Sequence, residues 1–202
     1  MISIEIISVT KDIILIFAAI ATAHVAINGL QSWSKELNGK ADFEVARNLI
    51  RSVYKLRDEL RYCRSPWIPQ GEFSEDYDPS NKSPEEVAKA FAYIYKNRWK
   101  PVTNALQDFE SQALEAEALW GTGVKSKTDE LRQCARNLQV AIDAYISNKA
   151  NDGDDFKSDP DFGKAIRAEI AATNDENNPL TLKISNAIKN IEEEVRPHFN
   201  RS

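Results

Sequence analysis

One uncharged stretch decides the architecture of this 202-residue chain: IILIFAAIATAHVAINGLQSWS, residues Ile13–Ser34. It contains no Asp, Glu, Lys or Arg, although charged residues make up 28% of the chain. A helix needs about 20 apolar residues to cross a bilayer, and Trp33 lies where an interfacial aromatic residue is expected. The sequence therefore predicts that residues 1–34 form an N-terminal segment with a transmembrane anchor.

The flanking charges predict the orientation of this anchor. Lys11 alone precedes it, whereas a run of basic residues follows: Lys35, Lys40, Arg47, Arg51, Lys55, Arg57, Arg61 and Arg64. Lys and Arg concentrate on the cytoplasmic side of membrane helices, which places the C-terminal part in the cytoplasm at the plasma (inner) membrane. Two cysteines without C-x-x-C spacing, Cys63 and Cys134, agree with a reducing compartment and indicate neither a disulfide framework nor a thiolate metal site.

Two alternatives to the anchor remain open. Residues 21–23 read Ala-Thr-Ala, an A-x-A cleavage pattern behind an apolar run, so the segment is also compatible with a signal peptide. The preceding MISIEIISVTKD has one Lys against Glu5 and Asp12, whereas signal peptides begin with net positive charge. The third interpretation is a buried helix of a soluble protein.

Small residues line one face of the predicted anchor. Ala18, Thr22 and Ala26 recur at intervals of four, and small-xxx-small faces allow transmembrane helices to approach closely. The hypothesis is that the anchor self-associates into a homo-oligomer. The alternative is that these are ordinary lipid-facing residues.

The rest of the chain, residues 41–200, is expected to be a cytoplasmic helical domain. Proline is absent before Pro66 and glycine occurs only seven times, which favours long helices. Asp42 is a predicted N-cap for a first helix, which ends before Pro66. Its apolar stripe steps by four and three residues: Val45, Leu49, Val53, Leu56, Leu60 and Cys63.

Three further long helices follow in the sequence. Ser83 with Pro84 and Glu86 predicts a helix start, and this helix runs to Trp120 with a kink caused by Pro101. Predicted helices then cover about 128–148 and 184–195, the last closed by Pro197, with a short helix over 162–170 between them. The predicted fold class is all-α: an N-terminal transmembrane helix followed by a four-helix-bundle-like domain with a long Pro-kinked helix.

Acidic segments separate these helices. Residues 65–83 predict an exposed loop. Four apolar side chains of this loop are expected to hold it against the bundle, namely Trp67, Ile68, Phe73 and Tyr77. Residues 151–161 predict a second acidic loop, and 174–179 a turn.

No catalytic, cofactor or metal residue is predicted. The net charge of −5 argues against nucleic acid as a partner. The histidines are His24, inside the predicted span, and His198 near the end, which gives little support to histidine-based catalysis. Residues 121–128 lack the second glycine and the preceding strand of a phosphate-binding P-loop, and residues 151–163 fit no EF-hand register.

The first cytoplasmic helix carries the one positive candidate, a basic stripe that predicts contact with anionic lipid headgroups or an acidic protein partner. The residues are Arg47, Arg51, Lys55, Arg57, Arg61 and Arg64. The alternative is that the stripe binds nothing and is only hydrated, because acidic neighbours such as Asp58 reduce its positive charge.

Residues 33–72, WSKELNGKADFEVARNLIRSVYKLRDELRYCRSPWIPQGE, resemble the opening of a group of uncharacterised bacterial proteins with an N-terminal membrane helix and a helical cytoplasmic domain. The resemblance implies a bacterial, membrane-anchored helical protein and carries no activity. The expected function is therefore a membrane-anchored binding, scaffolding or signalling module. The alternatives are a membrane-tethered enzyme without a His-based site and an exported soluble domain produced by signal cleavage.

Overall fold

The structure is a computed structural model that describes residues 2–81, 83–172 and 177–199, with side chains described from Leu15 onward. In these ranges the chain is helical and contains no strand, so the all-α prediction is confirmed. The described elements are α1 (Ile2–Cys63), the 3-10 turn η1 (Gln70–Glu72), α2 (Pro84–Trp120), α3 (Thr122–Ala150), α4 (Asp154–Ser158), α5 (Pro160–Ile170) and α6 (Pro179–Phe199).

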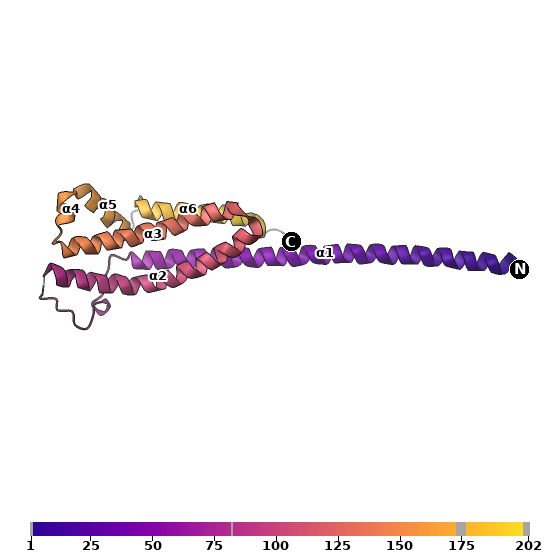
Figure 1. Ribbon diagram of the computed structural model, residues 1–202, viewed down its shortest axis with the longest axis horizontal. Helices are drawn as coiled ribbons and strands as arrows, with labels where there is room; N and C mark the ends of the chain where they lie inside the picture. Colours follow the sequence, from indigo (N-terminus) through magenta and orange to yellow (C-terminus); the bar gives the residue numbers. More distant parts are fainter. Residues whose placement is uncertain (1, 82, 173–176, 200–202) are drawn as a thin grey trace.

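The first helix extends far beyond the rest of the molecule. α1 has 62 residues, which corresponds to roughly 90 Å of helix, and Figure 1 shows its N-terminal part projecting as a single rod. Residues 15–38 are all exposed, and Val45 is the first buried residue. The C-terminal part of α1 is therefore a component of the helical domain, whereas residues 15–38 are not covered by any other part of the chain that the structure describes.

Four long helices build the domain by packing on one another in a ring. α1 contacts α2 and α6, and α3 also contacts α2 and α6. The short helices α4 and α5 lie at the end of the domain opposite the projecting rod (Figure 1), and α5 packs on α3. Burying the apolar stripe of each helix against its two neighbours removes these side chains from water, which is the main favourable contribution to folding.

The predicted stripe of α1 is buried as expected, from Val45 at 5% exposure to Leu49 and Cys63 at 0%. The predicted start of α2 is also confirmed, because the Ser83 hydroxyl accepts a hydrogen bond from the Glu86 backbone N–H at 3.4 Å, with Pro84 in the first turn. α2 ends at Trp120, where Gly121 takes a positive φ of 86°. This left-handed region strains residues with a Cβ, which explains the glycine.

Several predicted helix ends were wrong. Asp42 is not an N-cap, because α1 runs without a break from the predicted anchor into the domain. α3 begins at Thr122 instead of about residue 128, since Gly121 alone makes the turn. Pro197 lies inside α6 instead of closing it. The two residues beyond that proline are held by ring contacts, His198 with Trp120 and Phe199 with Phe43.

The loop predictions were partly right. Residues 65–81 contain η1 and otherwise form a loop, but the indole of Trp67 is 76% exposed instead of packed on the domain. Phe73 and Tyr77 stack on each other at 4.3 Å. The second acidic loop contains α4 and the first residues of α5. Of the turn predicted at 174–179, residues 174–176 lie outside the described residues, and α6 begins at Pro179.

Candidate functional site

The exposed half of α1 is the feature most unlike an ordinary domain surface. An 18-residue window of this helix reaches a mean hydropathy of 1.4 and contains no buried residue. Large apolar side chains such as Phe17 and Ile20 are directed into solvent along it. Length and composition therefore allow this helix to cross a membrane, although an N-terminal signal sequence meets the same criteria. Among the described residues, none between Leu15 and Asn38 is buried.

The small residues predicted to mediate self-association lie in this exposed half. Ala18, Thr22 and Ala26 are all exposed, and the Thr22 hydroxyl donates to the Ala18 carbonyl at 2.8 Å. Thr22 is thus satisfied within its own helix and requires no partner helix. Self-association through these residues stays a prediction.

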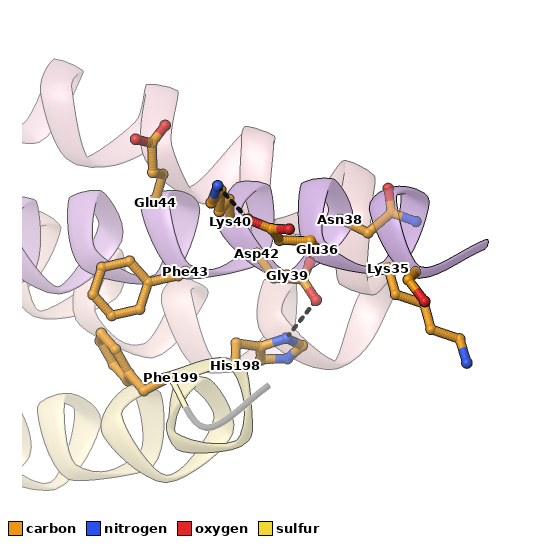
Figure 2. Close-up of a pocket in the computed structure, with 11 residues that line it drawn as sticks. Lys35, Glu36, Asn38, Gly39, Lys40, Asp42, Phe43, Glu44, His198 and Phe199 are labelled. Atoms are coloured by element: carbon orange, nitrogen blue, oxygen red, sulfur yellow. Dashed lines mark hydrogen bonds and ion pairs between the residues drawn. The ribbon is translucent and has the colours of Figure 1, made fainter. Parts of the chain in front are cut away.

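A groove marks the neck, where α1 leaves the domain (Figure 2). It has a volume of about 960 Å³ and is lined by α1 residues between Ser32 and Glu44 and by the end of α6. The imidazole of His198 stacks on Trp120, with ring centroids 3.8 Å apart. Asp42 joins this pair: its carboxylate accepts from Trp120 Nε1 at 3.2 Å and lies 3.7 Å from His198 Nδ1. We call Asp42, Trp120 and His198 the neck cluster.

The structure separates the predicted basic stripe into two groups. Arg47, Arg51, Lys55, Arg57 and Arg61 are exposed. Arg64 is 2% exposed, and its guanidinium donates to oxygens of the domain interior. Arg64 therefore does not belong to the exposed part of the stripe, and contact of the stripe with lipid or a partner stays a prediction.

The length of α1 also separates the stripe from a bilayer that ends near Ser34. Arg47 follows Ser34 by 13 positions and Arg61 by 27, which is about 20 Å and about 40 Å along a helix axis. Charges attract a lipid surface only within a Debye length, about 8 Å at physiological salt. On a helix that leaves the membrane upright, Lys35 and Lys40 are the cations best placed for headgroups.

Two buried arginines donate hydrogen bonds to backbone carbonyls at, or just beyond, the C-terminal ends of helices. Arg64 belongs to the predicted basic stripe, whereas Arg98 was not predicted from the sequence. Arg98, 3% exposed, donates to the carbonyls of Ser65 and Trp67, both at 2.6 Å, just after α1 ends. It also pairs with Glu72 at 2.5 Å. The signal was present, because Arg98 continues the four-residue steps of the α2 stripe between Ile94 and Val102.

Arg64 performs the same task at the C-terminal end of α5. Its Nε donates to the Glu169 carbonyl at 2.7 Å, and its Nη2 to the Ala168 and Ala171 carbonyls at 3.4 and 3.3 Å. The last carbonyls of a helix lack intrahelical partners and carry partial negative charge. Burial lowers the pKa of the Arg64 guanidinium, and the nearby Glu169 opposes this shift.

Arg64 also borders a second groove, between α1 and α6, with a volume of about 570 Å³. The cations around it are Arg57, Arg61, Arg64 and Lys189. Thr181 and Ser185 add hydroxyls, and Ile184 and Ile188 add apolar surface. The carboxylate of Glu192 also lines the groove, but it accepts a hydrogen bond from the Tyr54 hydroxyl at 2.7 Å. We call this the basic groove.

Neither thiol is placed for chemistry at a surface. Cys63 and Cys134 are free and buried, and burial raises the pKa of both, that of Cys63 to about 12. Within the described part of the chain, no group of three or more His, Cys, Asp or Glu is arranged to hold a metal ion.

No protein-family model, no curated protein and no solved structure matches this chain. The likeness of residues 33–72 to a bacterial group therefore stays a prediction, and any function has to be argued from the chain itself.

Proposed function

We propose that this protein is a single-pass membrane protein whose helical domain serves as a cytoplasmic binding, scaffolding or signalling module. One observation carries the proposal: α1 is a single helix with an apolar, uncovered N-terminal half and a C-terminal half built into the core of a domain. In water, the exposed apolar side chains would be unfavourable by about 25 cal/mol per Å². A bilayer removes that cost without any further protein contact.

The orientation rests on charge. One lysine precedes the span and eight Lys or Arg residues follow it by residue 64, which favours an N-terminus outside and a domain inside. Two buried thiols without disulfide partners fit a reducing cytoplasm. A bacterial inner membrane is the location that this orientation and the resemblance of residues 33–72 support.

The architecture of the domain is part of the proposal. The ring of contacts among α1, α2, α3 and α6 supports a four-helix bundle. A bend of α2 at Pro101 is expected, because a proline inside a helix removes one backbone hydrogen bond and crowds the carbonyl four residues earlier.

Topology labelling tests the proposal. The native cysteines are buried, so they do not react in the folded protein, and an engineered thiol reports its own location. We expect Ser3→Cys to react with a membrane-impermeant maleimide on intact cells. We expect Ser111→Cys, on the exposed surface of α2, to react only after the cells are opened. An alkaline wash should leave the full chain in the membrane fraction.

The alternatives give different results. Release by the alkaline wash would contradict the anchor. A mature N-terminus at His24 would support the exported domain instead. Labelling of Ser111→Cys on intact cells would show that the domain lies outside the cell, opposite to the proposed orientation.

A further inference from the structure

The lining of the basic groove contains more cations than carboxylates. Three arginines and Lys189 line it together with one carboxylate, Glu192, which accepts a hydrogen bond from Tyr54. Arg57 pairs with the neighbouring Asp58 at 3.0 Å, but Arg61 reaches that carboxylate only at 4.0 Å, and Lys189 lies 3.9 Å from Glu193. These pairs are exposed and weak, so they leave the lining cations able to bind an anion.

Arg64 is a buried cation whose hydrogen-bond acceptors are all neutral oxygens, with Glu169 as a nearby carboxylate that acts on its charge without a hydrogen bond. Its acceptors are backbone carbonyls, the Thr181 hydroxyl at 3.1 Å and the Asn178 amide oxygen at 2.8 Å. Among the ion pairs of the described residues, none includes Arg64. Buried charges in proteins are normally paired with an opposite charge. Nη1 has two N–H groups and Thr181 as its one acceptor in the described chain.

The start of α6 adds to the same field. Asn178 accepts from the Thr181 backbone N–H at 3.1 Å, as an N-cap residue does, and the first turns of this 21-residue helix line the groove. A helix N-terminus carries about half a positive charge and favours anions. Two side chains one turn apart, Ile184 and Ile188, provide an apolar wall beside these charges.

We propose that the basic groove binds a soluble organic phosphate, with the phosphoryl group between Arg61, Arg64 and Lys189 and an apolar moiety on Ile184 and Ile188. The groove volume of about 570 Å³ lies within the usual range for small-molecule sites and is much larger than a phosphate ion needs. A lipid headgroup is the less favoured source of this phosphate, since Arg61 lies about 40 Å along α1 from the predicted membrane boundary. The inference gives a ligand class to the binding role proposed above and rests on that role, but not on membrane insertion.

The test uses the full chain in nanodiscs of neutral phosphatidylcholine, titrated calorimetrically with phenyl phosphate, inorganic phosphate and phenol. We expect saturable binding of phenyl phosphate in the micromolar to millimolar range, weaker binding of inorganic phosphate and none of phenol. Arg61→Gln should weaken phenyl phosphate binding about tenfold, because it removes a charge-assisted hydrogen bond to the phosphoryl group. The matched control is Arg51→Gln, an exposed arginine of the same helix outside the groove, which should change the affinity less than twofold.

Three results would overturn the inference. They are no saturable binding of phenyl phosphate, equal weakening by Arg51→Gln and Arg61→Gln, and loss of binding when the nanodiscs contain phosphatidylglycerol. The last result would assign the groove to lipid headgroups. Each is distinguishable from a failed anchor, which the cysteine labels and the alkaline wash report independently.

Discussion

The two halves of α1 form one continuous helix but differ completely in their surroundings. Residues 15–38 are all exposed, whereas eight residues from Val45 to Cys63 are buried. The exposed half is uncharged from Ile13 to Ser34 and mainly apolar, although polar residues such as His24 and Asn28 interrupt it, and the second half repeats apolar residues in steps of three and four. Periodic hydrophobicity suits a helix with one protein-covered face, and a long uncharged, mainly apolar stretch has the length and composition of a membrane span. The two halves of this helix therefore differ in composition as they do in exposure.

The largest expected difference between the two halves is in the stability lost when a large apolar side chain is shortened to alanine. Leu49 is completely buried, so Leu49→Ala should lower the free energy of unfolding of the domain by about 2–5 kcal/mol. Ile20→Ala removes a similar side chain from the exposed half and should change it by less than about 0.5 kcal/mol. Urea unfolding of the full chain in detergent micelles, followed by tryptophan fluorescence, measures both. Equal effects would mean that the two halves are energetically coupled.

The second prediction compares arginines with different surroundings. Arg98→Met leaves the carbonyls of Ser65 and Trp67 and the carboxylate of Glu72 without their donor. We expect a loss of about 2–3 kcal/mol, below the usual cost of breaking a buried pair because Glu72 is 20% exposed. Limited proteolysis should detect faster cleavage within 65–81. Arg51→Met, at an exposed position of α1, is the control, and an equally large loss there would refute the distinction.

The third prediction concerns alkaline pH, to which the buried half of α1 should respond through Cys63. The folded state holds the Cys63 thiol protonated with a pKa of about 12, against about 9 for an exposed thiol. Above pH 9 the unfolded chain loses this proton and the folded chain keeps it, so the domain loses stability as pH rises. The loss is at most about 1.4 kcal/mol between pH 8 and pH 10.

Urea unfolding of the native chain and of Cys63→Ala at pH 8 and pH 10 tests whether loss of the Cys63 proton lowers the stability of the domain. The variant should lose less stability at pH 10 than the native chain does. Identical losses would show that Cys63 does not contribute. Tyr95, whose pKa burial also raises to about 12, should retain its effect in the variant, mainly above pH 10.

Much of the fold was predictable because it depends on local patterns. The stripe of α1, the Ser83 cap and the end of α2 at Trp120 each follow from a few neighbouring residues. The junction between the anchor and the domain was not predictable in this way. Residues 35–44 carry no apolar period, and Asp42 resembles an N-cap in sequence, but its carboxylate is used by Trp120, which lies 78 positions further along the chain.

The candidate sites were less predictable for the same reason. The basic stripe on α1 was visible, but its division between an exposed surface and the buried Arg64 depends on where α5 ends. The basic groove needs Lys189 and Ser185 of α6 beside Arg57 and Arg61. No spacing in the sequence places residues more than 120 positions apart next to each other.

The smallest expected effect lies at the boundary between the two halves, in the neck cluster. His198→Ala removes the ring stacked on Trp120, which should cost about 1 kcal/mol of unfolding free energy. The change also removes the α6 side chain next to Asp42, so amide exchange should become faster in residues 39–44 and stay slow in 49–60. Hydrogen exchange of the full chain measures this, with Phe162→Ala at the opposite end of the domain as the control.

This experiment decides what fixes the boundary along α1. If the amides of residues 39–44 stay protected from exchange in His198→Ala, the first buried turn at Val45 alone sets the boundary between the exposed and buried halves. The neck cluster then only covers that boundary. If protection is lost as far as Val45 and no further, the end of α6 determines where the exposed half of the helix ends and the half built into the protein core begins. A loss that spread to Leu49 and Leu60 would contradict the separation of the two halves, because a local contact would then control the whole domain.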